Sequence, residues 1–254
     1  MKGILVRNIL IHNEIKKIKQ ECCKNNIKLI LLKGAALVEL FPEYSFFRDM
    51  EDVDVLVEKK DFCKFLNILK YLGYELYYED PNVVYKKDID LKIDILTELW
   101  YLNNKENKKL INSCIEKEGL YFLPPKEMLR HIIIHSYIEH NYIEEKWLKD
   151  IMLIKEKFNI DFEMKNYIPK KFLIFVNKKI YYKGHFLQFL FLPFSKKISF
   201  LFKKFFPKID FMIRRYAIKD IFALPFFYFY RWASFIVFFI LSLNKKINLH
   251  EQEF

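Results

Sequence analysis

An apolar run interrupted by two aspartates is the feature that most constrains how this chain folds. Residues 52–57 read Asp-Val-Asp-Val-Leu-Val, and alternate side chains of a β-strand point to the same face of a sheet. The run therefore predicts a strand on which Asp52 and Asp54 project side by side. Burying two neighbouring carboxylates is unfavourable unless cations neutralise them. We therefore expect a magnesium site here, because Mg²⁺ takes oxygen ligands such as carboxylates.

A second apolar strand is predicted just upstream, over residues 27–32, and it ends at Lys33-Gly34. Gly34 lets the backbone approach a ligand closely, and Lys33 supplies a cation beside it. A short helix is expected over residues 35–40, where the free N–H groups and the dipole of its first turn favour a phosphate. Lys33 and Gly34 are therefore candidate nucleotide-binding residues.

Arg48 lies between these two strands, after a loop that begins near Pro42. Its planar guanidinium is suited to bidentate binding of a triphosphate. The alternative is an ion pair with Glu51 or Asp49.

A third carboxylate is expected on the strand predicted over residues 88–95. Apolar residues 89, 91, 93 and 95 fall on one face of this strand, and Asp88, Asp90, Lys92 and Asp94 fall on the other. Periodicity alone does not choose among the three aspartates.

The remaining chain favours helices. Helical spacing of apolar residues predicts helices over residues 3–23, 61–72 and 126–140, and a hairpin is expected over residues 74–86. Residues 104–118 are expected to be a polar helix or loop. We therefore predict an α/β (α+β) fold. It has a small mixed sheet in a catalytic core, residues 1–122, and a helical region, residues 123–254.

Charge is distributed unevenly. Residues 1–160 hold 26 basic and 26 acidic residues, whereas residues 161–254 hold 17 basic and 6 acidic residues and 27 of the 46 aromatic residues. This composition indicates an anionic partner for residues 161–254: a membrane surface, a nucleic acid or a charged glycan. The alternative is a solvated, lysine-rich helical bundle.

The apolar stretch over residues 221–243 is long enough to span a bilayer, but it contains Arg231. A charged residue in mid-membrane costs about 3 kcal/mol on insertion scales. We therefore favour a helix that packs on the protein or lies at a membrane interface over a spanning helix.

The four cysteines form no C-x-x-C pair, and the N-terminus lacks the continuous apolar stretch of a signal peptide. Reduced thiols in a cytoplasmic protein are expected. Together with the charge distribution, this predicts a cytoplasmic protein with peripheral contact to the inner membrane surface.

Four features together resemble the polymerase-beta-like nucleotidyltransferase superfamily: Lys33-Gly34, Arg48, the 52–57 run, and Leu72-Gly73-Tyr74 after a helix. The resemblance covers roughly residues 25–155. It is closest to a branch of uncharacterised bacterial nucleotidyltransferases in which Lys-Gly replaces the usual Gly-Ser. Residues 146–150 resemble the helical segment that follows the catalytic core in that branch.

The resemblance implies transfer of a nucleoside monophosphate from an NTP, such as ATP, to an acceptor hydroxyl. It assigns two Mg²⁺ ions to Asp52 and Asp54. It makes Asp94 the third carboxylate, although Leu96 replaces the histidine that usually follows. Lys33, Gly34 and Arg48 would bind the triphosphate.

Two other functions fit the same residues. One is a non-catalytic module that keeps the nucleotide-binding fold and docks on a membrane or partner, although the presence of all three carboxylates argues against lost activity. The other is an RNA-directed nucleotidyltransferase toxin, which the basic region permits but no RNA-binding motif supports.

Overall fold

The computed structural model describes residues 2–77, 80, 82–140, 144–161, 163, 166–168 and 184–244. The chain divides into two compact units. Unit 1 comprises residues 1–132 and 148–160, and unit 2 comprises residues 133–147 and 161–254. The predicted division after residue 122 stays a prediction.

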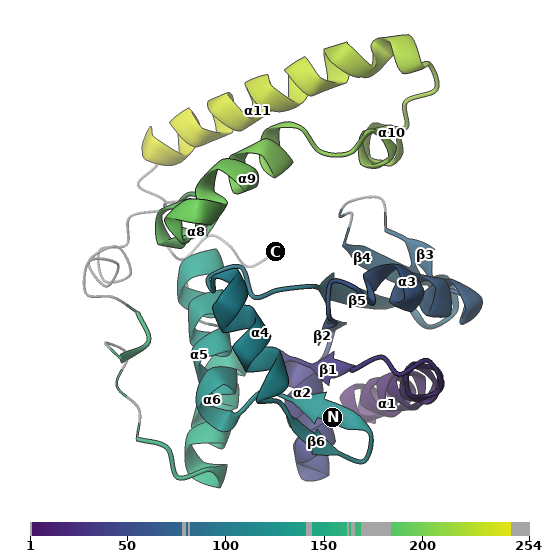
Figure 1. Cartoon of the computed structure of the whole chain (residues 1–254), viewed down its shortest axis with the longest axis vertical. Helices are drawn as coiled ribbons and strands as arrows, with labels where there is room; N and C mark the ends of the chain where they lie inside the picture. The colour runs from purple at the N-terminus through teal and green to yellow at the C-terminus, as the bar shows by residue number, and fades with distance from the viewer. Residues whose placement is uncertain are drawn as a thin grey trace. The chain divides into compact units, whose positions relative to one another are not determined.

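Among the described residues, unit 1 is built on a seven-stranded mixed sheet with the order β3-β4-β5-β2-β1-β7-β6 (Figure 1). The central strand β2 pairs parallel with β5 and antiparallel with β1. The strands are β1 (Ile30–Leu31), β2 (Asp52–Leu56), β3 (Glu75–Leu76), β4 (Val83–Lys86), β5 (Leu91–Leu96), β6 (Ile115–Lys117) and β7 (Leu120–Phe122).

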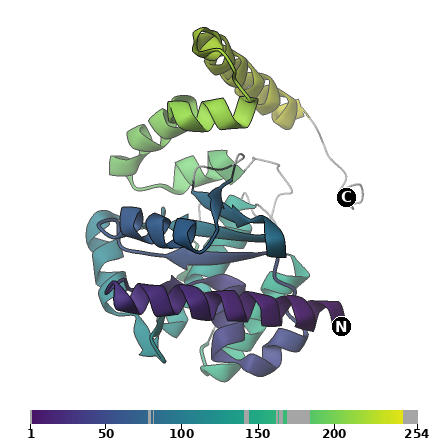
Figure 2. The same ribbon diagram turned by 90° about the vertical axis from the view of Figure 1, so that its right-hand side faces the viewer.

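Helices complete both units. In unit 1, α1 and α3 run side by side (Figure 2). The helices that begin in unit 1 or return to it are α1 (Lys2–Lys24), α2 (Lys33–Leu40), α3 (Phe62–Tyr71), α4 (Asn104–Asn112), α5 (Pro125–Ile134) and α6 (Glu145–Lys157), with 3₁₀ turns η1 (Pro42–Phe46) and η2 (Lys87–Ile89). Unit 2 contains the π-helical turn η3 (His135–Glu139), α8 (Gly184–Phe191), α9 (Phe194–Phe205), α10 (Ile209–Tyr216), η5 (Ile221–Ala223) and α11 (Leu224–Asn244). The predicted α/β fold with a helical C-terminal region is confirmed.

The core of unit 1 lies on the central strands. Side chains on both faces of β1 and on most of β2 are buried, whereas β5 alternates buried and half-buried residues. The apolar face of α3 covers the sheet through Phe65, Ile68 and Leu69. The alternation of β5 and the amphipathic character of α3 match the sequence pattern.

Several predicted elements begin or end elsewhere. The strand predicted over residues 27–32 is Ile30–Leu31, and the helix predicted over residues 35–40 begins at Lys33, so Lys33 and Gly34 lie in its first turn. The strand predicted from residue 88 starts only at Leu91, because Asp88 lies in η2 and Asp90 has a left-handed backbone with φ of 50°. Aspartate tolerates this conformation better than most residues, so a turn forms there. The helix predicted to reach residue 140 ends as an α-helix at Ile134.

The β6–β7 hairpin was not predicted from the sequence. Its two strands are three residues long and are joined at Glu118-Gly119, both of which have positive φ. Such a turn matches the twist of the flanking strands. The strands are too short to produce a readable alternation.

Unit 2 has its own small apolar cluster. Phe211, Met212 and Ile218 are buried together, and residues from the start of α11 pack against them. Within the described part of the chain, no helix combines the length and the apolar character needed to cross a membrane.

Candidate active site

The pairing of β2 with β5 places the predicted carboxylates on one face of the sheet. The parallel register sets Asp54 opposite Asp94 and Asp52 opposite Lys92. Register partners in neighbouring strands share a face, and Asp52 shares the face of Asp54 because the two are two residues apart. The sheet therefore brings Asp52, Asp54 and Asp94 together, whereas Asp88 and Asp90 lie off the strand.

Burial differs among these carboxylates. Asp54 is buried, Asp94 is half-buried and Asp52 is exposed. The site therefore opens toward the Asp52 end of β2 and becomes enclosed toward Asp54.

Lys33 contacts Asp54, the most buried of the three carboxylates. Its Nζ lies 2.5 Å from Asp54 Oδ1, and both side chains are largely shielded from solvent. The pair is held at the junction of β1 and β2, where the Leu32 N–H donates to the Asp54 carbonyl over 3.0 Å. The position beside Asp54 is therefore one that favours a cation.

The backbone of Lys33 is strained. Its φ is 47°, in the left-handed region, which costs a residue with a Cβ about 1–2 kcal/mol. Such strain persists only where the surrounding structure imposes it, and it clusters at functional sites. Lys33 therefore combines an unfavourable backbone conformation with an ion pair to Asp54.

Arg48 is buried beside the start of α2. Its Nε donates to both oxygens of Asp150 on α6, at 2.8 and 3.1 Å, and its Nη1 donates to the Asp49 carbonyl. The carboxylate partner is thus Asp150 rather than Glu51 or Asp49. The guanidinium is anchored on its Nε side, and its predicted role on a triphosphate stays a prediction.

Asp150 also accepts a hydrogen bond from the Tyr44 hydroxyl over 2.9 Å. Burial, followed by the charge and hydrogen bond of Asp150, raises the pKa of Tyr44 well above its ordinary value. Tyr44 therefore stays protonated and acts as a donor at physiological pH. Together Arg48 and Tyr44 compensate a carboxylate that has no solvent exposure.

Sequence reasoning missed Asp150, although a signal for it exists. In α6 the buried residues are Trp147, Asp150, Ile151 and Ile154, spaced as one face of a helix. An aspartate on the apolar face of a helix requires a buried partner. The pattern therefore indicates that Asp150 has a buried partner, but it does not identify Arg48 as that partner.

Gly34 makes room for Arg48. A Cβ added at Gly34 would lie 2.9 Å from Arg48 Nη2 and 3.1 Å from its Cζ. The close approach expected at this glycine is therefore made by the guanidinium.

Replacing Gly34 by alanine is expected to destabilise unit 1 by about 1–3 kcal/mol, as overpacked core sites do. The guanidinium cannot simply move away, because Asp150 holds its Nε. Urea unfolding of Gly34→Ala measures the loss. Gly3→Ala is the control, since no atom lies within 4 Å of a Cβ added there. Equal stability of the two variants would contradict this packing role.

Helix α1 fixes the ends of the two aspartate strands. Arg7 donates to the Met50 carbonyl over 3.1 Å, just before β2, and to the Asp90 carbonyl over 2.7 Å, just before β5. Asn8 Nδ2 donates to the Arg48 carbonyl over 2.7 Å. These contacts tie β2, β5 and Arg48 to a single helix.

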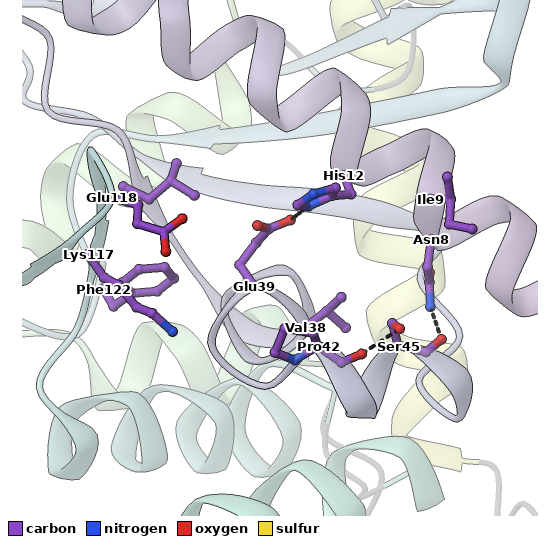
Figure 3. A pocket seen from close by; sticks show the side chains of 11 residues that line it. Asn8, Ile9, His12, Val38, Glu39, Pro42, Ser45, Lys117, Glu118 and Phe122 are labelled. Carbon is purple, nitrogen blue, oxygen red and sulfur yellow. Dashed lines mark hydrogen bonds and ion pairs between the residues drawn. The ribbon is translucent and has the colours of Figure 1, made fainter.

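A pocket of about 260 Å³ lies elsewhere in unit 1, between α1, the end of α2, η1 and the β6–β7 hairpin (Figure 3). None of the predicted site residues lines it. Several of its polar side chains are hydrogen-bonded: His12 Nδ1 lies 2.5 Å from Glu39, and Ser45 donates to the Pro42 carbonyl. This pocket and the candidate site at the carboxylates are therefore separate features of unit 1.

The donors at the carboxylates suit a divalent cation chemically. They are hard oxygen ligands, and Asp54 already holds a cationic group. In the described ranges, however, no three His, Cys, Asp or Glu side chains are arranged to hold a metal ion as they stand. The Lys33 ammonium lies at Asp54, where a cation bound to that carboxylate would also lie.

A family model described as an uncharacterised nucleotidyltransferase matches residues 1–167. The chain belongs to this family. The match includes the Lys-Gly pair, Arg48, all three carboxylates and Asp150, so the family predicted from the motifs is confirmed. Membership indicates nucleotidyl transfer in general.

Two solved structures are similar to the chain. One is a solution structure of the antibiotic-resistance factor ANT(2'')-Ia, with 14% identity and a TM-score of 0.45 over 64% of this chain and 86% of that chain. The other is a crystal structure of ANT(2'')-Ia with adenylyl-2''-tobramycin, with the same identity and TM-score over 65% and 93%. No curated protein matches the chain significantly.

Proposed function

We propose that this nucleotidyltransferase moves a nucleoside monophosphate from an NTP to an acceptor hydroxyl. The oxygen of the acceptor forms a bond to the α-phosphorus, the bond from that phosphorus to the bridging oxygen breaks, and pyrophosphate leaves. The hydroxyl proton is lost to solvent. The observation that carries the proposal is the register of β2 and β5, which sets Asp54 opposite Asp94 with Asp52 on the same face.

Asp52, Asp54 and Asp94 would hold two Mg²⁺ ions. When bound, such ions lower the pKa of the attacking hydroxyl and neutralise charge on the leaving group. Asp54 can accept them only if Lys33 releases it. We infer that the Lys33 ammonium then turns to the phosphates, where it stabilises the charge that develops on pyrophosphate. Arg48 would support the same phosphates from the start of α2.

The proposal is tested with the full chain, Mg²⁺ and each of the four α-labelled NTPs, ATP first. Label transfer to a panel of hydroxyl acceptors, including sugars, aminoglycosides, nucleosides and RNA, is measured together with pyrophosphate release. Magnesium-dependent release that increases with one acceptor class supports the proposal. No release with any NTP and acceptor would contradict it.

One observation favours a second candidate, a non-catalytic nucleotide-binding module. Lys33 already neutralises Asp54 at 2.5 Å, as a replacement for a metal ion would. Such a module would bind ATP equally well with Mg²⁺ or with EDTA and release no pyrophosphate. Isothermal titration under both conditions separates the two candidates.

Two variants of Lys33 test whether its ammonium binds phosphate. Lys33→Ala and Lys33→Gly both remove the ammonium, so both should weaken ATP binding by at least about tenfold, the value of one charge-assisted hydrogen bond. Binding of AMP should change much less. Equal losses for ATP and AMP in isothermal titration would count against a phosphate role.

The same two variants should differ in stability. Lys33 has a left-handed backbone, which glycine adopts without a steric cost, so Lys33→Gly should be more stable than Lys33→Ala by about 1 kcal/mol. Urea unfolding checks this difference. Equal stabilities would contradict the prediction, because they would mean that the backbone at position 33 leaves the left-handed conformation in Lys33→Ala.

For residues 161–254 we propose peripheral contact with an anionic membrane surface from the cytoplasmic side. Their excess of basic over acidic residues, 17 against 6, supports this proposal.

A further inference from the structure

Helix α9 in unit 2 turns an apolar stripe toward solvent. Phe194, Ile198, Leu201 and Phe202 are 85%, 71%, 40% and 62% exposed. Their spacing of four, seven and eight residues places them on one face of the helix. An apolar face of this kind is normally buried, so this one is suited to a partner.

Other side chains attach α9 to its own unit. Phe200 packs against Phe189 of α8 with ring centroids 6.3 Å apart, and Lys197 Nζ lies 5.2 Å from the centre of the same ring. Trp232 of α11 donates to the Phe205 carbonyl over 2.7 Å. These contacts use residues outside the exposed set, whereas Phe202 of the stripe also packs against Phe206 with ring centroids 5.3 Å apart. Phe194 and Ile198 are the most exposed of the four and can therefore be changed with the least effect on the fold of unit 2.

The segment from η5 into the start of α11 repeats the pattern. Phe222, Phe226, Phe229 and Tyr230 are exposed at the same spacing of four, seven and eight residues. The intervening Phe227 and Tyr228 pack on the buried cluster around Phe211. Two helices of one unit therefore each bury one apolar side and expose another.

The charge of this segment decides which partner fits. Residues 184–244 contain nine Lys and Arg but only Asp210 and Asp220 as acidic residues, and the α9 sequence contains four lysines and no acidic residue. A second copy of the chain would bring like charges together. An anionic bilayer provides both a negative surface and an apolar layer beneath it.

Nucleic acid fits less well than lipid. Sequence-independent binding of single strands depends on aromatic side chains that stack on bases. Ile198 and Leu201 lie in the middle of the α9 stripe and are aliphatic. Their chemistry matches acyl chains.

We propose that α9 lies in the interface of an anionic phospholipid bilayer, with Phe194, Ile198, Leu201 and Phe202 toward the acyl chains, and that the exposed start of α11 is a second anchor. This deepens the membrane contact of the proposed function by naming the residues that make it. It does not depend on nucleotidyl transfer.

The test is flotation of the full chain with vesicles of phosphatidylglycerol and phosphatidylcholine, or of phosphatidylcholine alone, at low and raised salt. The chain should float with the anionic vesicles, and raised salt should release most of it. Phe194→Ser with Ile198→Ser should reduce the bound fraction at least about tenfold, since two buried apolar side chains contribute several kcal/mol. The fold should persist, because both side chains are exposed.

Two matched controls accompany this double variant. Phe47→Ser with Tyr71→Ser removes two exposed aromatic side chains of unit 1 and should leave flotation unchanged. Lys203→Gln with Lys208→Gln removes two exposed charges beside the stripe and should weaken binding to anionic vesicles only.

Three outcomes would overturn the proposal. Flotation could be equal for the stripe variant and its unit 1 control. Sedimentation could show a dimer that only the stripe variant abolishes, which would make the stripe an interface between copies. The stripe variant could lose salt-sensitive RNA binding while neither chain binds vesicles. Pyrophosphate release measured without vesicles on the same samples should be unchanged in the stripe variant, so failure of lipid binding and failure of catalysis are distinguished.

Discussion

Asp52→Asn and Asp54→Asn should each reduce nucleotidyl transfer by about 10²–10³-fold, the effect of removing one principal electrostatic group from an active site. An amide keeps the shape of the carboxylate but removes the charge that would hold Mg²⁺. The two variants should differ in stability. Asp52 is exposed, so its variant should unfold like the wild type, whereas Asp54→Asn leaves the shielded Lys33 ammonium without its carboxylate.

Pyrophosphate release and urea unfolding measure the two effects separately. Lys33→Met combined with Asp54→Asn should regain the stability that Asp54→Asn loses, because the shielded ammonium that Asp54 neutralised is removed as well, but it should stay inactive. If Asp54→Asn loses stability and keeps activity, the site is misassigned.

The third carboxylate has a matched control in the same segment. Asp94→Asn should be as inactive as Asp52→Asn, while Asp88→Asn should keep near wild-type activity, because Asp88 is exposed in η2 and lies off the strand. The reverse result would move the third carboxylate to the turn before β5.

Local sequence pattern predicted the parts of the site that depend on neighbouring residues. The strand at residues 52–57 and the following amphipathic helix follow from spacing alone, because each pattern completes within a few residues. Periodicity did not distinguish Asp94 from Asp88 and Asp90. Which of the three lies on the strand depends on where β5 begins, and the left-handed backbone at Asp90 leaves only Asp94 on it.

Contacts between residues that lie far apart in the sequence could not be predicted from local pattern. Arg48 and Asp150 are 102 residues apart, and nothing in either neighbourhood identifies the other as its partner. The sequence therefore left two roles open for Arg48, a triphosphate ligand or an ion pair with Glu51 or Asp49, and the structure pairs it with the buried carboxylate of Asp150. Likewise, the three-residue strands of the β6–β7 hairpin are defined by pairing with the sheet and not by their own composition.

Asp150→Ala should produce the largest loss of stability in the chain, about 3–5 kcal/mol, as expected when one partner of a buried ion pair is removed. Asp150 is fully buried, and its loss leaves the buried Arg48 guanidinium without its carboxylate and Tyr44 without its acceptor. Urea unfolding of the full chain measures the change. Glu43→Gln is the matched control, because it breaks an exposed ion pair to the same helix, Glu43 to Lys157 at 3.1 Å, and should have little effect.

A double variant then separates the structural role of Arg48 from its proposed role on phosphate. Arg48→Met with Asp150→Leu replaces the ion pair by apolar side chains of similar size, which is often neutral or stabilising. If the pair only supports the fold, this variant should be stable and should bind ATP like the wild type. We expect it to be stable but to bind ATP at least about tenfold more weakly and AMP nearly unchanged, because the guanidinium lies beside Gly34 at the start of α2, where a phosphate is favoured. Unchanged ATP binding in the stable double variant would remove Arg48 from the active site and leave it as the buried link between α6 and the sheet.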